Sequence, residues 1–116
     1  MEIKIEDTYR IAIHMAGDFA TAKSLCKKFA WDSPTCVTVK PQTFIYTGGL
    51  EEGVEIGLVN YPRFPKTEDQ LVGIAKRLTE MLIEEMHETS ALIVTDQQTF
   101  WLSRRNEVVD IDPTKT

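Results

Sequence analysis

The residues of this chain that could perform acid–base chemistry are few. His14 and Asp18 lie four positions apart, and a histidine beside a carboxylate can act as a general base with its partner. The alternating residues around His14 indicate a strand that ends before Asp18, so the spacing does not ensure that the two side chains meet. As a rule such a histidine is an ordinary residue of a strand face or an interface. No serine or cysteine has a nucleophile signature and no carboxylate cluster suggests a metal, so we expect no catalytic residues, no metal, no cofactor and no enzyme activity.

The segment 60–65 (NYPRFP) offers different chemistry, the binding of a phosphate-bearing aromatic ligand. Its two prolines flank Arg63 and Phe64, which lowers the entropy lost when that pair is held in place. The guanidinium group matches phosphate and can stack, and the phenyl ring offers a platform for a base. A stiff strand-to-helix connector, with Phe64 packed against the second helix, explains the segment equally well. The sequence leaves both interpretations open.

The end of the last predicted strand carries further candidates. Arg104 and Arg105 are adjacent, and because neighbouring strand residues point to opposite faces, at most one of them joins a given site. Trp101 could supply an aromatic wall, although a core position is commoner for a tryptophan on such a strand. The two cysteines, Cys26 and Cys36, form no CxxC pair and are expected to be free thiols in a reducing compartment.

Composition argues against nucleic-acid and membrane partners. The 116 residues have a formal net charge of −5, whereas proteins that neutralise DNA phosphates need a basic surface. The N-terminus has no basic region followed by a long apolar run, and no stretch approaches transmembrane length. We therefore expect a cytoplasmic protein that binds neither DNA nor a membrane.

Hydrophobic periodicity predicts the elements that position these residues. Alternation over residues 3–15 indicates a strand, and helical spacing after Asp18 indicates a first helix. Thr67 and Gln70 form a capping-box pattern at the start of a second helix, which we expect to extend to His87. The remaining strands are predicted over residues 36–40, 43–47, 54–60, 91–95 and 99–103.

This order, β-α-β-β-β-α-β-β, predicts an α+β fold in which an antiparallel or mixed sheet carries two helices on one face. We expect a single ligand-binding domain over residues 1–105, followed by a C-terminal tail at 106–116. The uncovered face of the sheet would carry Arg10 and His14. Because a chain this short has a modest core and an open sheet face, we expect self-association, most simply a homodimer.

Several stretches carry a further signal: 7–14 (DTYRIAIH) running to 16–18 (AGD), 44–49 (FIYTGG), 60–65 (NYPRFP) and 103–105 (SRR). Together they resemble the first family of phage Thoeris anti-defence proteins, over about residues 6–105. That family consists of non-enzymatic sponges, which sequester cyclic ADP-ribose isomers made by bacterial TIR proteins and so keep the defence effector inactive. The resemblance implies a homodimer with two equivalent pockets, in some members a higher oligomer with cyclic-oligonucleotide sites. It also implies action in the cytoplasm of the infected bacterial host.

By this resemblance the ligand pocket would lie around Lys27 or Lys28, Asn60, Arg63, Phe64 and Arg105. A sponge needs only differential affinity, which cations and stacked aromatic rings supply, and it needs no activated water. Two alternatives remain. One is a small nucleotide-processing enzyme that uses His14 and Asp18, which turnover of a nucleotide would reveal. The other is a protein-interaction adaptor that uses the open sheet face, which a protein complex with an empty pocket would support.

Overall fold

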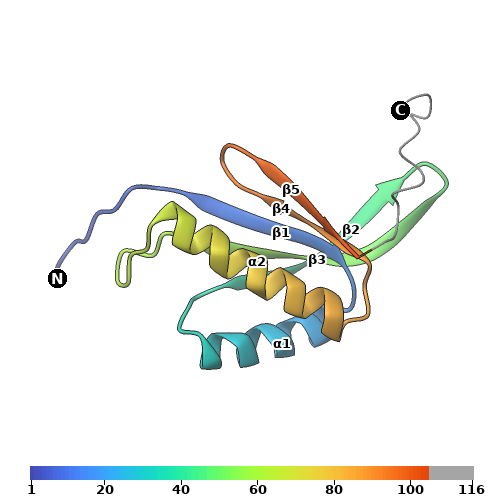
Figure 1. Cartoon of the computed structure of the whole chain (residues 1–116), viewed down its shortest axis with the longest axis horizontal. Coiled ribbons are helices and arrows are strands. Elements are labelled where there is room, and N and C mark those ends of the chain that lie inside the picture. Colours follow the sequence, from blue (N-terminus) through green and yellow to red (C-terminus); the bar gives the residue numbers. More distant parts are fainter. Residues whose placement is uncertain (105–116) are drawn as a thin grey trace.

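The computed structural model describes residues 1–104, so Arg105 and the tail predicted over 106–116 lie outside the described residues. Two helices cover one face of a five-stranded antiparallel sheet with the strand order β2-β3-β1-β4-β5 (Figure 1). Within the described residues, no helix is long and apolar enough to span a bilayer. The elements are β1 (Arg10–Ala16), α1 (Phe19–Asp32), β2 (Thr38–Tyr46), β3 (Gly49–Val59), α2 (Glu68–Glu85), β4 (Ser90–Val94) and β5 (Thr99–Ser103).

The predicted α+β fold with both helices on one face is confirmed, and the strand boundaries differ from the prediction most at β1, β2 and β3. β3 begins at Gly49 and not at residue 54, because it pairs with β2 up to the turn of the hairpin. β1 begins at Arg10 and not at residue 3, because its partner strand β3 ends at Val59, opposite Arg10, and leaves the earlier residues without a ladder. The strands predicted over 36–40 and 43–47 form one continuous strand, β2. Pro41 is tolerated inside it because β2 lies at the edge of the sheet, where a residue can do without an N–H donor.

The core fills the space between the sheet and the helices. The odd positions of β1, Ile11, Ile13 and Met15, are buried, as the alternation predicts. The capping box of α2 is confirmed, because Thr67 Oγ1 accepts from the Gln70 backbone N–H at 3.1 Å and Gln70 Oε1 accepts from the Thr67 N–H at 2.9 Å. From there α2 lays a helical stripe on the sheet: Leu71, Ile74, Ala75, Leu78, Leu82 and Ile83.

The C-terminal end of α2 fixes the chain direction toward β4. The backbone N–H groups of His87 and Glu88 donate to the carbonyls of Glu84 and Ile83, at 3.2 and 2.9 Å. His87 has a φ of 57°, the left-handed conformation that this Schellman motif requires at the position after the helix cap. The helix therefore ends at Glu85, two residues before the predicted end, and Glu88 follows at a defined place.

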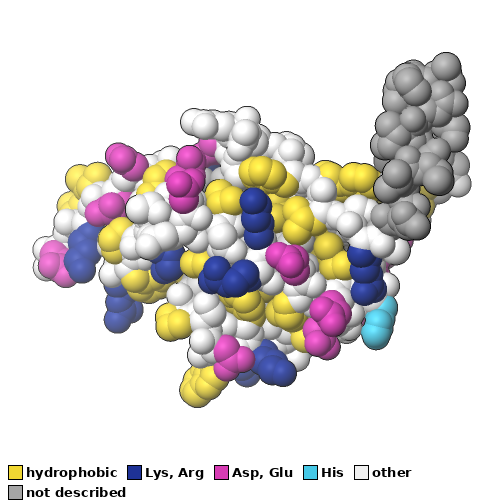
Figure 2. All heavy atoms as spheres, in the orientation of Figure 1, with side chains coloured by type: hydrophobic (Ala, Val, Ile, Leu, Met, Phe, Trp, Pro, Cys, Tyr) yellow, Lys and Arg dark blue, Asp and Glu magenta, His cyan; other side chains and the backbone are white. Residues whose placement is uncertain are grey.

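The uncovered face of the sheet has small side chains along its centre. Ala12 lies opposite Gly57 and Ala16 opposite Gly53, with His14 between them on β1. Larger side chains, such as Phe44 on β2 and Trp101 on β5, stand on the flanking strands. The other side of the molecule, where α2 lies in front, mixes cationic and acidic side chains with apolar ones (Figure 2).

Candidate functional site

The connector before α2 has a structural role. Asn60 is buried, with 7% of the residue exposed. Its Nδ2 donates to the Asp7 carbonyl at 2.8 Å, and its Oδ1 accepts from the Lys66 backbone N–H at 3.0 Å. The ring of Phe64 stacks on that of Tyr61, with the centroids 4.8 Å apart. Because the Asn60 amide already bonds to the backbone on both sides, it is poorly placed to bind a ligand.

The residues assigned to a cyclic ADP-ribose pocket are not gathered in one place. Lys27 lines a hollow between α1 and β2, Arg63 lines a second hollow, and Phe64 lines a third beside α2. Lys28 is exposed on α1 and lines none of these hollows. Arg105 lies outside the described residues. Lys27, Arg63 and Phe64 therefore line three different hollows.

His14 and Asp18 do not form a pair. Asp18 caps α1, and its Oδ2 accepts from the backbone N–H and the hydroxyl of Thr21 at 2.9 and 2.8 Å. These bonds stabilise the charged form and hold the pKa of the carboxyl below its usual value. Gly17, with a φ of 138°, turns the chain between them from the sheet into the helix. The enzyme alternative therefore named the wrong partner for His14.

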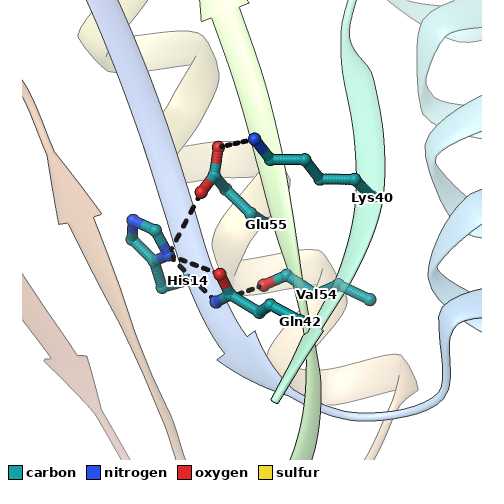
Figure 3. Close-up of polar contacts among 5 residues, drawn as sticks. All are labelled: His14, Lys40, Gln42, Val54 and Glu55. Carbon is teal, nitrogen blue, oxygen red and sulfur yellow. Dashed lines mark hydrogen bonds and ion pairs between the residues drawn. The ribbon is translucent and has the colours of Figure 1, made fainter. Parts of the chain in front are cut away.

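The partners of His14 come from β2 and β3 (Figure 3). Gln42 Nε2 lies 3.0 Å from His14 Nδ1 and also donates to the Val54 carbonyl at 3.2 Å. Glu55, opposite His14 in the ladder, places Oε1 3.8 Å from the same nitrogen and Oε2 3.2 Å from Lys40 Nζ. The contacts of the imidazole with Gln42 and Glu55 are both made by Nδ1, and the other ring nitrogen points toward the side of β4 and β5 (Figure 3).

A hollow of about 200 Å³ lies on that side of His14. It combines strand residues of the uncovered face with the loop between α2 and β4. We call it the open-face hollow, and the side chains that give it its chemistry are His14, Phe44, Glu51, Glu88, Leu92 and Trp101. Trp101 is 52% exposed, so it forms an aromatic wall of this hollow and not a part of the core.

The position of the Phe44 ring depends on the absence of a side chain at Gly53. A Cβ atom built on Gly53 would lie 2.4 Å from Phe44 Cε2 and 2.5 Å from the Met15 carbonyl oxygen. The ring therefore rests directly on the backbone of β3, beside Glu51, which is its cross-strand neighbour. In this way β2 and β3 supply one aromatic and one acidic wall.

The opposite acidic wall is Glu88, which the Schellman motif at the end of α2 holds in place. Partial burial raises the pKa of the Glu88 carboxyl above its usual value, and the negative charge of Glu51 raises it further. The positive charge of Arg104 acts in the opposite direction. Glu51 and Glu88 thus lie close enough to repel each other, and a bound cation would relieve that repulsion.

This arrangement suits one class of ligand. Two carboxylates attract a positive charge, and the Phe44 and Trp101 rings can stack on a planar ring and attract a cation with their faces. His14 adds a nitrogen that can donate or accept a proton. The open-face hollow is therefore suited to an organic cation that carries an aromatic ring.

Comparison with known proteins identifies the fold. No protein-family model matches the sequence, and neither does any curated protein. Phage SAM lyase in complex with S-methyl-5′-thioadenosine matches with a TM-score of 0.69 and 14% identity, over 89% of this chain and 95% of that chain. Phage SAM lyase in the apo state matches with a TM-score of 0.68 and 15% identity, over 84% and 90%. At these identities the likeness shows a shared fold.

The comparison corrects the functional expectation from the sequence. A non-enzymatic sponge for cyclic ADP-ribose isomers is wrong, as is the expected lack of enzyme activity, because the matching fold is that of an enzyme. The resemblance to phage Thoeris proteins holds only at a coarser level, since the structural neighbours are phage proteins. Of the segments that suggested the sponge family, 7–18 contains β1, 44–49 contains the turn of the β2–β3 hairpin and 60–65 is the connector before α2, whereas 103–105 runs beyond the described residues.

Three residues of the open-face hollow were missed in the sequence. Phe44 and Glu51 face each other only in the register of the β2–β3 hairpin, which the sequence does not fix. Glu88 was missed because its position depends on where α2 ends. Gly53 becomes a signal once β3 is known to begin at Gly49, since a glycine inside a strand marks a close approach of another group.

Proposed function

We propose that this chain is a lyase for a sulfonium nucleoside of the S-adenosylmethionine type, from which it releases S-methyl-5′-thioadenosine. The observation that carries the proposal is the open-face hollow, in which Glu51 and Glu88 stand beside Phe44 and Trp101. A sulfonium nucleoside joins a fixed positive charge to a purine, which is the ligand class that these walls suit. The shared fold with phage SAM lyase supports the same choice.

The reaction requires little from the protein. When the bond between the sulfonium sulfur and the amino-acid carbon breaks, its electron pair stays on sulfur and neutralises the charge. The carbon fragment then closes on its own carboxylate oxygen, or it loses a proton to a base and becomes an alkene. Neither route needs water or a second substrate, and the two are told apart by the amino-acid product.

The acidic walls serve binding more than rate. Positive charge on sulfur decreases toward the transition state, so carboxylates beside it stabilise the substrate at least as well as the transition state. The rate must come from holding the reacting atoms in position and from excluding water. We therefore expect that removing a carboxylate raises KM more than it lowers kcat.

The test is incubation of the purified protein with S-adenosylmethionine, followed by chromatographic measurement of S-methyl-5′-thioadenosine. We expect release over many turnovers, and we expect Glu51→Gln to raise KM by roughly tenfold, the loss of one charge-assisted contact. Glu52→Gln is the matched control, because Glu52 bonds to Thr43 and does not line the hollow. A protein that neither binds nor cleaves this substrate would refute the proposal.

A further inference from the structure

A second hollow lies beside β5, which is an edge strand of the sheet that the described residues form, at the side of α2. It measures about 690 Å³, which makes it larger than the open-face hollow. We call it the β5-edge hollow, and its charged and aromatic side chains are Lys76, Glu80, Glu84, Phe100, Trp101 and Arg104. Its remaining lining is Ile83, Leu102 and Ser103.

The charges of the β5-edge hollow are balanced. Lys76, Glu80 and Glu84 follow one another at intervals of four residues on α2 and therefore lie on one face of the helix. Arg104 adds a second cation from the end of β5. Figure 2, which shows the α2 side, has cationic and acidic side chains close together among apolar ones.

Two cations and two carboxylates fit a zwitterion better than an anion. An α-amino acid carries one ammonium and one carboxylate, and each finds an opposite charge here. A polyphosphate would meet Glu80 and Glu84 as well as the two cations, and repulsion by the glutamates would offset the attraction. The lining of the β5-edge hollow is therefore better matched to a free amino-acid group than to a polyphosphate.

The two hollows share a partition. Trp101 lines both of them. Arg104, which lines the β5-edge hollow, donates from Nε to the carbonyl of Glu88 at 2.7 Å, and Glu88 lines the open-face hollow. A ligand that extends past this partition would reach both hollows.

We propose that the β5-edge hollow binds the zwitterionic amino-acid end of the ligand whose nucleoside and sulfonium groups occupy the open-face hollow. Lys76 binds the carboxylate and the glutamates that follow it on α2, Glu80 and Glu84, bind the ammonium, while Arg104, whose Nε is bonded to the Glu88 carbonyl, adds positive charge near the C-terminal end of α2. This proposal rests on the proposed function, and it adds how the protein selects a substrate that still carries its amino acid over one that has lost it.

The test compares two probes in the cleavage assay, where the affinity for S-adenosylmethionine is measured as KM and the affinity for S-methyl-5′-thioadenosine as its inhibition constant. S-Adenosylmethionine carries the amino-acid group, and S-methyl-5′-thioadenosine lacks it. Lys76→Met keeps the length of the side chain and removes its charge, and we expect it to weaken binding of S-adenosylmethionine by roughly tenfold while binding of S-methyl-5′-thioadenosine stays within twofold. Glu84→Gln should show the same selectivity between the probes.

Arg77→Met is the matched control, since Arg77 is the next residue on α2 but lines a different hollow with Phe64 and Asp69. It should leave both affinities unchanged. Equal weakening of both probes by Lys76→Met, or no weakening of either, would overturn the inference. If the wild-type protein binds neither probe, the proposed function fails and the inference fails with it. If the wild type binds both equally well, only the inference fails.

Discussion

The side-chain amide of Gln42 lies 3.0 Å from Nδ1 of His14 and at the same time donates to the carbonyl of Val54. One amide thus joins β2, β3 and β1 on the uncovered face of the sheet. It also fixes the imidazole so that its other nitrogen points toward the side of β4 and β5 (Figure 3), where the open-face hollow lies.

Replacing Gln42 with leucine should therefore lower the free energy of unfolding by about 1 kcal/mol, because a typical hydrogen bond contributes that much and the lost bonds are partly buried. Urea unfolding at pH 7 measures the change. Gln98→Leu serves as the control, since this exposed residue in the β4–β5 turn uses its backbone for its bonds to Thr95. If both variants lose the same free energy of unfolding, the hydrogen bonds of the Gln42 side chain do not stabilise the sheet as we expect.

Stability should depend on pH through Glu88. Its pKa in the folded protein is above the usual value, so folding favours the protonated form, and the stability that protonation confers is lost as the pH rises through that pKa. Glu88→Gln replaces the carboxyl with a neutral amide, so the variant does not lose this stability as the pH rises. We expect the melting temperature of the variant to exceed that of the wild type at pH 7, with a smaller difference at pH 4. The same variant should bind a sulfonium ligand less well. If the difference in melting temperature between the variant and the wild type is the same at both pH values, ionisation of Glu88 is not its cause.

Gly53→Ala should distort the open-face hollow. The new methyl group would lie 2.5 Å from the Met15 carbonyl oxygen and would displace the Phe44 ring. We expect a loss of about 1–3 kcal/mol in the free energy of unfolding, typical of overpacking, together with weaker ligand binding. Gly73→Ala, inside α2, meets only the end of the Arg77 side chain at 3.8 Å and should stabilise the protein by about 0.5–1 kcal/mol. The decisive result is a lower free energy of unfolding for Gly53→Ala and a higher one for Gly73→Ala.

His87→Gly should stabilise the fold. The residue adopts a φ of 57°, which costs an ordinary side chain about 1–2 kcal/mol relative to glycine, although glycine also adds entropy to the unfolded chain. We expect a net gain of up to about 1 kcal/mol in thermal unfolding. Because the Schellman motif is retained, Glu88 should stay in place and substrate affinity should be unchanged. A destabilised variant would mean that the imidazole makes a contact that outweighs the backbone conformation.

The homodimer expected from the sequence stays a prediction. Three apolar residues on the uncovered sheet face are substantially exposed, Val59 at 46%, Leu92 at 37% and Trp101 at 52%. Burial of such a patch against a second copy would remove it from water. Sedimentation velocity at micromolar concentration should show an oligomer, and a species of monomer mass alone would count against it.

The elements were predictable where a local pattern determines them. The alternation of β1 and the capping box of α2 act over a few residues, so the sequence reveals them. The open-face hollow depends instead on register and on the exact end of α2, because Glu51 meets Phe44 across a ladder and Glu88 follows a helix terminus. Arg63 and Phe64 were predicted from the sequence because they carry a charge and a ring, and in the structure the Phe64 ring stacks on Tyr61.

The two edges of the sheet differ in how they would meet another strand. β2 has Pro41 and Lys40 within it, which discourage pairing, whereas β5 reads Thr-Phe-Trp-Leu-Ser and has neither a proline nor a charge. Growth of the sheet into an aggregate is therefore directed to the β5 side, and an added strand there would run beside the β5-edge hollow. A ligand held in that hollow would compete with the added strand, so a substrate-saturated protein should resist aggregation on heating better than the same protein without substrate.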